Sequence, residues 1–197
     1  MLLLDWDIQL FQYINSLWID PWLDAILPFW RNKYIWAPLY LFFIAFCYLN
    51  FERKGIWIVL CFFITVGISD FVSSKIVKPT IKRQRPCNDV QTKKQVKVRS
   101  LVKCGGGYSF TSSHATNHFA MAAFVLVLFG RRYWWLKAPL WFWAFSISYG
   151  QVYVGVHYPL DIFGGACLGI AIGTLIGRFA RNYITLDFLD PPPSEVA

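Results

Sequence analysis

Three short clusters of polar residues in this chain carry the side chains that phosphate chemistry needs. Two histidines, His114 and His157, can serve as nucleophile and proton donor. Asp161 follows His157 by four residues, one helical turn, and a carboxylate there can hold the imidazole in one tautomer. The clusters are Lys78–Pro86, Tyr108–His114 and Val156–Asp161. Together they predict a site that transfers a phosphoryl group without a metal.

The same clusters contain groups that can hold the phosphate itself. Lys78 and Arg85 can neutralise its charge, and the Arg fork can bind two oxygens at once. Ser112 and Ser113 directly precede an apolar run, so we expect them at a helix N-terminus. Free backbone N–H groups at such an end favour an anion.

In these residues the chain resembles the type 2 phosphatidic acid phosphatase superfamily. The family pattern is Lys, six residues, Arg-Pro; then Pro-Ser-Gly-His; then Ser-Arg, five residues, His, three residues, Asp. The order, the intervals and the apolar setting agree over roughly residues 70–177. The matching residues are Lys78, Arg85, Pro86, Ser112, His114, His157 and Asp161, with Thr111 in place of Pro and Ser113 in place of Gly.

The resemblance implies a role for each matching residue. His157 would attack phosphorus and form a phosphohistidine, Asp161 would orient it, and His114 would protonate the leaving group. The resemblance also implies that no metal or cofactor is needed. The groups expected to hold the phosphoryl oxygens are Lys78, Arg85, Ser112 and the Ser113 N–H.

One position departs from the family in a way that bears on activity. The Ser-Arg pair of the third motif falls on Gly150 and Gln151, so a charge-assisted contact to the phosphate is lost. Gln151 is still expected among the phosphate-binding residues, because its amide can donate a hydrogen bond without a charge. Three readings remain open. A loop cation such as Arg99 or Lys103 substitutes for the missing Arg, the site suits another phosphate such as a diphosphate, or the protein is a weak or inactive relative.

The functional hypothesis is an integral membrane lipid phosphatase, and the substrate stays open. Candidate substrates are undecaprenyl pyrophosphate, phosphatidylglycerophosphate, phosphatidic acid and lipid A phosphate, with a lean towards a polyprenyl diphosphate because the basic loop could serve two phosphates. One alternative is a lipid phosphotransferase. Another is a lipid-phosphate binding protein with weak or no turnover, which the change to Gln151 favours.

The composition predicts an all-α, polytopic membrane bundle. The chain is 56% hydrophobic and only 15% charged, below the charge of an ordinary soluble domain. We expect five spans, with a sixth left open around Trp22–Trp30. The five apolar segments are Tyr34–Leu49, Gly55–Ser69, Ala115–Gly130, Ala138–Val156 and Ile162–Gly177. Several are shorter than roughly 20 residues, so flanking turns must extend them.

The two ends of the chain differ from this middle part. Apolar residues recur at helical spacing from Trp6 to Leu17, which predicts an amphipathic helix lying in the membrane interface. Residues 1–181 are predicted to form one membrane-embedded phosphatase domain, and the Pro-rich tail at 182–197 to be disordered. Overlapping GxxxG steps from Gly165 to Gly177 indicate close packing, either within the bundle or in a weak homo-oligomer.

Charge and cysteine placement bear on sidedness. Residues 78–113 hold nine basic residues and one acidic residue, a net +8 that equals the excess of the whole chain. If these cations serve the substrate, the short loops place the C-terminus in the cytoplasm and the site at the periplasmic face of a bacterial inner membrane. Cys87 and Cys104 could then form a disulfide. The loop lacks interleaved aromatic residues, which argues against nucleic acid as partner.

The three histidines also allow metal or cofactor binding as alternative functions. His114 and His118, four residues apart, could bind zinc, but no carboxylate or cysteine lies nearby in the sequence. Haem or quinone binding by the three histidines would leave Lys78 and Arg85 without a role. We therefore predict no metal, and a lipid phosphate as the partner of the site.

Overall fold

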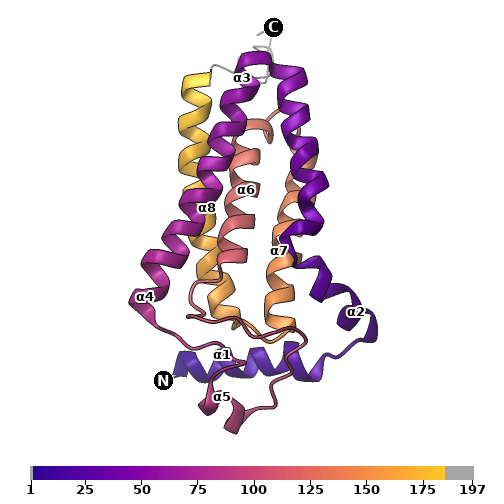
Figure 1. The fold of residues 1–197 in the computed structure, drawn as a ribbon, viewed down its shortest axis with the longest axis vertical. Coiled ribbons are helices and arrows are strands. Elements are labelled where there is room, and N and C mark those ends of the chain that lie inside the picture. The colour runs from indigo at the N-terminus through magenta and orange to yellow at the C-terminus, as the bar shows by residue number, and fades with distance from the viewer. Residues whose placement is uncertain (1, 185–197) are drawn as a thin grey trace, which may run out of the picture.

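The structure, a computed structural model, describes residues 2–184, and none of these residues lies in a β-strand. Long helices run side by side as a bundle, and short helices and loops gather at one end of it (Figure 1). The predicted all-α architecture is confirmed. The α-helices are α1 Leu2–Gln12, α2 Pro21–Trp30, α3 Ala37–Phe71, α4 Lys78–Ile81, α5 Val90–Gln95, α6 Ser113–Phe129, α7 Lys137–Tyr153 and α8 Pro159–Ile184.

Helix α3 consists of two arms joined by a sharp turn. Glu52 has φ 49° and ψ −126°, far from helical values, and the two arms run antiparallel on either side of it (Figure 1). This turn falls within residues 50–54, the loop expected between the first two predicted spans. The second arm continues through a π-helical turn, Val72–Val77, into α4, so Lys78 lies at the lower end of the bundle.

Two helical segments of the described chain are long and apolar enough to cross a membrane. They are Lys33–Ile81, which contains both arms of α3, and Pro159–Ile184, and α6 is a shorter apolar helix. Large apolar side chains point outward from these helices, for example Trp57 and Phe163, which are 62% and 67% exposed. An apolar surface of this kind fits a lipid surrounding.

Helix α1 lies across the end of the bundle (Figure 1). A π-helical turn, Tyr13–Leu17, prolongs it. The predicted apolar stripe is largely turned away from the protein, since Trp6 and Leu17 are more than half exposed. Asp7, which helical periodicity set apart from the apolar stripe, is instead fully buried. Trp6, Tyr13 and Leu17 of the stripe thus face outward, while Asp7 and Phe11 are buried against the bundle.

Helices α6 and α8 pack along a line of glycines. A Cβ at Gly169 would overlap the Thr116 carbonyl oxygen, and one at Gly173 would overlap that of Ala120. The GxxxG steps are therefore occupied by packing within the bundle. This seam holds the start of α6, with His114, beside the start of α8, with Asp161.

Several helix boundaries differ from the sequence-based expectation. Helix α7 ends at Tyr153 rather than 156, because the chain turns at Gly155, whose φ is +88°. Helix α8 begins at Pro159, whose fixed φ suits a first helical turn. It continues to Ile184, so residues 182–184, placed in the tail by sequence, are helical. The remaining tail residues, 185–197, lie outside the described part.

Candidate active site

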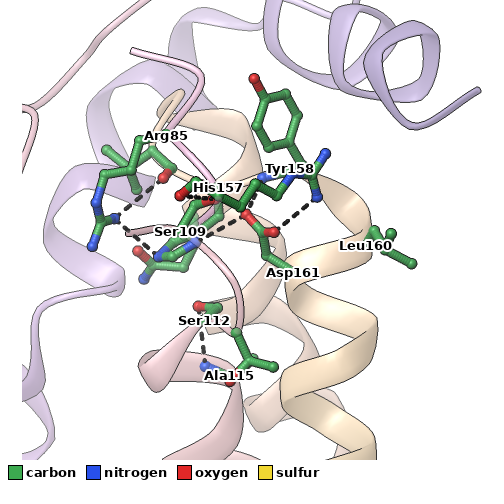
Figure 2. Close-up of polar contacts among 12 residues, drawn as sticks. Arg85, Ser109, Ser112, Ala115, His157, Tyr158, Leu160 and Asp161 are labelled. Atoms are coloured by element: carbon green, nitrogen blue, oxygen red, sulfur yellow. Dashed lines mark hydrogen bonds and ion pairs between the residues drawn. The ribbon is translucent and has the colours of Figure 1, made fainter. Parts of the chain in front are cut away.

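The three predicted clusters meet at the end of the bundle beside α1. The loop after α4 carries Arg85, the start of α6 carries Ser112 to His114, and the turn between α7 and α8 carries His157. Figure 2 shows His157 and Asp161 facing one another, with Arg85 on the other side of the imidazole. Arg85 and Asp161, 76 positions apart in the sequence (161 − 85), thus share one site.

The contacts of His157 define its tautomer. The imidazole is buried, with 2% of the residue exposed. Arg85 Nη1 lies 3.1 Å from His157 Nε2, and a guanidinium can only donate, so Nε2 must accept. The proton therefore sits on Nδ1 and points to Asp161 Oδ2 at 3.3 Å. Burial lowers the pKa of His157 to about 4 despite the carboxylate beside it, which keeps the ring neutral.

Asp161 is held from three directions. Its Oδ2 also accepts the Tyr158 N–H at 2.9 Å, and its Oδ1 accepts from Arg83 Nη1 at 2.9 Å. The carboxylate is fully buried. An aspartate fixed in this way can keep the imidazole of His157 in one orientation and one tautomer.

Arg83 extends this network to the N-terminal helix. Its Nη2 contacts Asp7 Oδ2 at 2.5 Å, and its Cζ lies 3.9 Å from the ring centroid of Tyr158. Asp7 Oδ1 also accepts the Leu160 N–H at 2.8 Å. Burial alone lowers the pKa of Arg83, but Asp161 and Asp7 outweigh it and raise that pKa. Sequence reasoning missed this pairing, because nothing local connects residue 7 with residue 83.

The predicted phosphate-holding groups are close to the histidine. Lys78 Nζ donates to Ser113 Oγ at 2.9 Å. Ser112 caps α6, with its Oγ accepting from the Ala115 N–H at 3.5 Å (Figure 2). The backbone N–H of Ser112 bonds to the Asp161 carbonyl at 3.1 Å, which ties α6 to α8. Arg85 also donates to the Val156 carbonyl at 3.2 Å, while its buried Nε has no partner among the described residues.

The contacts of His118 bear on the hypothesis that His114 and His118 bind zinc. His118 Nδ1 lies 2.7 Å from the His114 carbonyl oxygen and must donate to it. The His118 ring then packs edge-on against Trp143 at 4.9 Å. Within residues 2–184 no group of three or more His, Cys, Asp or Glu side chains could hold a metal ion. His118 therefore has the contacts of a packed core histidine.

Two further predictions concern the basic loop. Cys87 and Cys104 are joined by a disulfide, with their Cα atoms 6.0 Å apart. Arg99, one of the cations considered as a substitute at Gln151, instead bonds to Asp24 at 2.5 Å and to the Asn15 carbonyl at 3.1 Å. That reading of Arg99 is wrong, because its charge is already neutralised.

Comparisons with known proteins agree with this geometry. The family model described as the PAP2 superfamily matches residues 56–184, a stretch that contains all three clusters. The chain belongs to the PAP2 superfamily. This membership confirms the resemblance seen in the motifs, and it makes the protein a membrane phosphatase of this superfamily.

Individual relatives of this PAP2 protein are phosphatases. A lipid A 4′-phosphatase of Bacteroides thetaiotaomicron is 32% identical over 169 residues, which cover 84% of this chain and 72% of the relative. An undecaprenyl-diphosphatase of Sulfolobus acidocaldarius is 28% identical, covering 86% and 76%. The crystal structure of a PAP2-type phosphatidylglycerolphosphate phosphatase from Bacillus subtilis superposes with a TM-score of 0.72 at 21% identity, covering 92% of this chain and 88% of that chain. This last likeness concerns the fold.

Proposed function

We propose that this protein hydrolyses the phosphate of a membrane lipid through a phosphohistidine on His157. The observation that carries the proposal is the tautomer of His157, whose Nε2 lone pair faces Arg85 while Nδ1–H faces Asp161. In the first step, Nε2 forms a bond to phosphorus and the bond from phosphorus to the lipid oxygen breaks. The leaving oxygen takes the electron pair of that bond and a proton from His114.

The second step returns the site to its starting state. Water attacks phosphorus, the N–P bond breaks, and its electron pair returns to Nε2. The water proton passes to His114, which is then ready to act again as acid. Asp161 stabilises the positive charge on the imidazole while the phosphoryl group is attached.

Cations in the site take the role that a metal has in many phosphatases. Lys78 and Arg85 have no carboxylate within 4.0 Å among the described residues. Their charge is thus available for the phosphoryl oxygens, together with the Ser112 hydroxyl and the Ser113 backbone N–H at the start of α6. On this basis we propose turnover that is independent of added metal.

A lipid substrate is supported by an apolar cavity that lies farther along the bundle from the site. An apolar cavity of about 320 Å³ lies between α3, α6 and α7, and its lining includes Phe43, Met121 and Trp143. Trp143 in turn contacts His118, one turn along α6 from His114. The names of the relatives make lipid A phosphate and undecaprenyl pyrophosphate the first substrates to test, alongside phosphatidic acid and phosphatidylglycerophosphate.

For the membrane arrangement we propose five spans with the site at the periplasmic face. The spans are the two arms of α3, then α6, α7 and α8, while the 10-residue α2 is too short to cross alone. The disulfide between Cys87 and Cys104 fits an oxidising compartment. A membrane-impermeant maleimide should label these two cysteines in intact cells only after treatment with an impermeant reductant. Labelling that needs permeabilised cells would place the loop in the cytoplasm.

The decisive assay measures phosphate release by purified protein in detergent, with EDTA, on the four lipid phosphates. Turnover should survive EDTA and be lost in His157→Ala, while His118→Gln, a control at a histidine outside the proposed machinery, keeps it. Labelled phosphate should be trapped on the protein in an alkali-stable, acid-labile form. Transfer of that label to an added unphosphorylated lipid would favour a phosphotransferase. Binding of lipid phosphate with no release would favour a binding protein.

A further inference from the structure

The end of α2 delivers a cation to the candidate site from outside the sequence motifs. Arg31 directly follows α2. The helix is attached to α7 at two points: Tyr153 OH donates to Asp24 Oδ1 at 2.7 Å, and Trp30 Nε1 donates to Ser146 Oγ at 2.9 Å. These bonds fix the position of Arg31 relative to α7.

Arg31 is bound to Gln151, the residue that stands where the motif has Arg. Its Nε and Nη2 donate to Gln151 Oε1 at 3.0 Å and 2.8 Å. Because a guanidinium only donates, the amide must present its oxygen to Arg31 and turn Nε2 the other way. Gln151 is fully buried, and this Nε2 has no hydrogen-bond partner among residues 2–184. A buried donor without an acceptor points to a ligand that supplies one.

Gln151 is also joined directly to the nucleophile. Its backbone carbonyl accepts the N–H of Val156 at 3.1 Å and that of His157 at 3.2 Å. The charge of Arg85 acts on Arg31, and the charge of Arg31 acts on His114. The guanidinium therefore belongs to the same group of residues as the two histidines.

The half-buried cations at this end of the bundle fall into two sets. Arg83 and Arg99 are paired with carboxylates. Within the described chain, no carboxylate lies within 4.0 Å of the other three, which are Arg31, Arg85 and Lys78. Three unpaired cations, with unpartnered N–H groups on Arg85 and Gln151, form a set of donors for an anion with several oxygens.

We propose that Arg31 binds a phosphoryl oxygen of the substrate, with Gln151 holding its guanidinium and donating Nε2 to the same phosphate. This inference rests on the proposed phosphatase function and names a further substrate-binding residue for it. It also accounts for both departures in the third motif, at Gly150 and Gln151. Gly150 faces the same helix end, since a Cβ there would lie 3.8 Å from Arg31 Cβ, so both altered positions contact the segment that supplies the charge.

The test compares Arg31→Ala with Lys33→Ala, a control at an exposed cation two residues away. For the lipid phosphate that wild type hydrolyses fastest, Arg31→Ala should lower kcat/KM about 100-fold or more, as loss of one oxyanion donor does. Lys33→Ala should stay within about twofold, because a surface charge contributes little. The double variant Arg31→Ala, Gln151→Arg restores a guanidinium at the motif position and should regain at least about tenfold over Arg31→Ala.

A binding measurement keeps this inference separate from the proposed function. Orthovanadate and inorganic phosphate should raise the Tm of wild type in detergent, and Arg31→Ala should remove most of that rise. If Arg31→Ala does not fold, Gln151→Glu serves instead, because its carboxylate pairs with Arg31 and should abolish the rise without loss of basal Tm. Wild-type phosphate binding in either variant overturns the role of Arg31, as does a double variant that regains nothing. Absence of His157-dependent turnover in wild type, with binding intact and Arg31-dependent, instead overturns the phosphatase.

Discussion

Replacing Asp7 by Asn removes one negative charge from the buried network while keeping the size of the side chain. The Asn Oδ1 can still accept the Leu160 N–H, now 2.8 Å from Asp7. The Asn amide would face the Arg83 guanidinium, so that two donors meet where an ion pair existed. Arg83 would keep its bond to Asp161 and its contact with the Tyr158 ring.

The size of the effect follows from burial. A hydrogen bond to a charged group contributes about 1.5–3 kcal/mol, and breaking a buried pair costs about 3–5 kcal/mol. The Arg83 side chain is 14% exposed and retains one carboxylate, so solvent and Asp161 compensate in part. We expect Asp7→Asn to lower the free energy of unfolding by about 2–3 kcal/mol. Asp7→Ala also deletes the Leu160 bond and should cost about 1 kcal/mol more.

Thermal unfolding in detergent, followed by tryptophan fluorescence, measures this effect. At about 2–4 °C per kcal/mol, Asp7→Asn should lower Tm by about 5–10 °C. Asp5→Asn, an exposed aspartate on the same helix, is the matched control and should shift Tm by less than about 1 °C. If Asp7→Asn unfolds at the same temperature as Asp5→Asn, then α1 is not held through Arg83, and the reasoning fails.

Two further predictions concern His157, the proposed nucleophile, and the glycine seam between α6 and α8. Burial lowers the pKa of His157 to about 4, so its ¹⁵N NMR titration should have a midpoint near pH 4, and a midpoint at or above 6.5 would contradict the buried neutral ring. Since the unfolded chain binds this proton first, stability should fall as the pH drops from about 6.5 to about 4. Gly169→Ala should lower stability by about 1–3 kcal/mol, because its Cβ meets the Thr116 backbone. Gly67→Ala, with nothing within 4 Å of its Cβ, is the control. Equal Tm values for the two variants would show that α6 and α8 can move apart without loss of stability, contrary to this prediction.

Much of the candidate site could be predicted because the spacing of the motif residues shows which of them lie on one turn of a helix or at its start. The four-residue interval from His157 to Asp161 and the position of Ser112 before an apolar run both express helix geometry, which sequence reveals directly. The fold class followed from apolar composition in the same way. Span ends were less accurate, since α7 and α8 meet at a turn set by Gly155 and Pro159.

The residues that sequence reasoning missed are those brought in by tertiary packing. Arg31 meets Gln151 across 120 positions, and Asp7 meets Arg83 across 76. Neither pair has a local pattern, because α1 and α2 reach the site by lying against the bundle end. Arg99 was considered for the role assigned to Arg31 because charge and loop membership can be read from a sequence. The pairing of Arg99 with Asp24, in contrast, cannot be read from the sequence.

The close contact between α6 and α8 at Gly165, Gly169, Gly173 and Gly177, the glycine seam, restricts substitution far more than the segments around the site do. Backbone meets backbone between α6 and α8, so the spacing of the helices that begin at His114 and Asp161 has almost no freedom to vary. The cations proposed to bind phosphoryl oxygens lie on separate segments: Lys78 on α4, Arg85 on the following loop, and Arg31 at the end of α2. A directed-evolution library seeking a new lipid substrate should therefore vary α2 and the 82–112 loop, sparing Arg83, Arg85, Ser112 and the two disulfide cysteines, and leave the seam as it is.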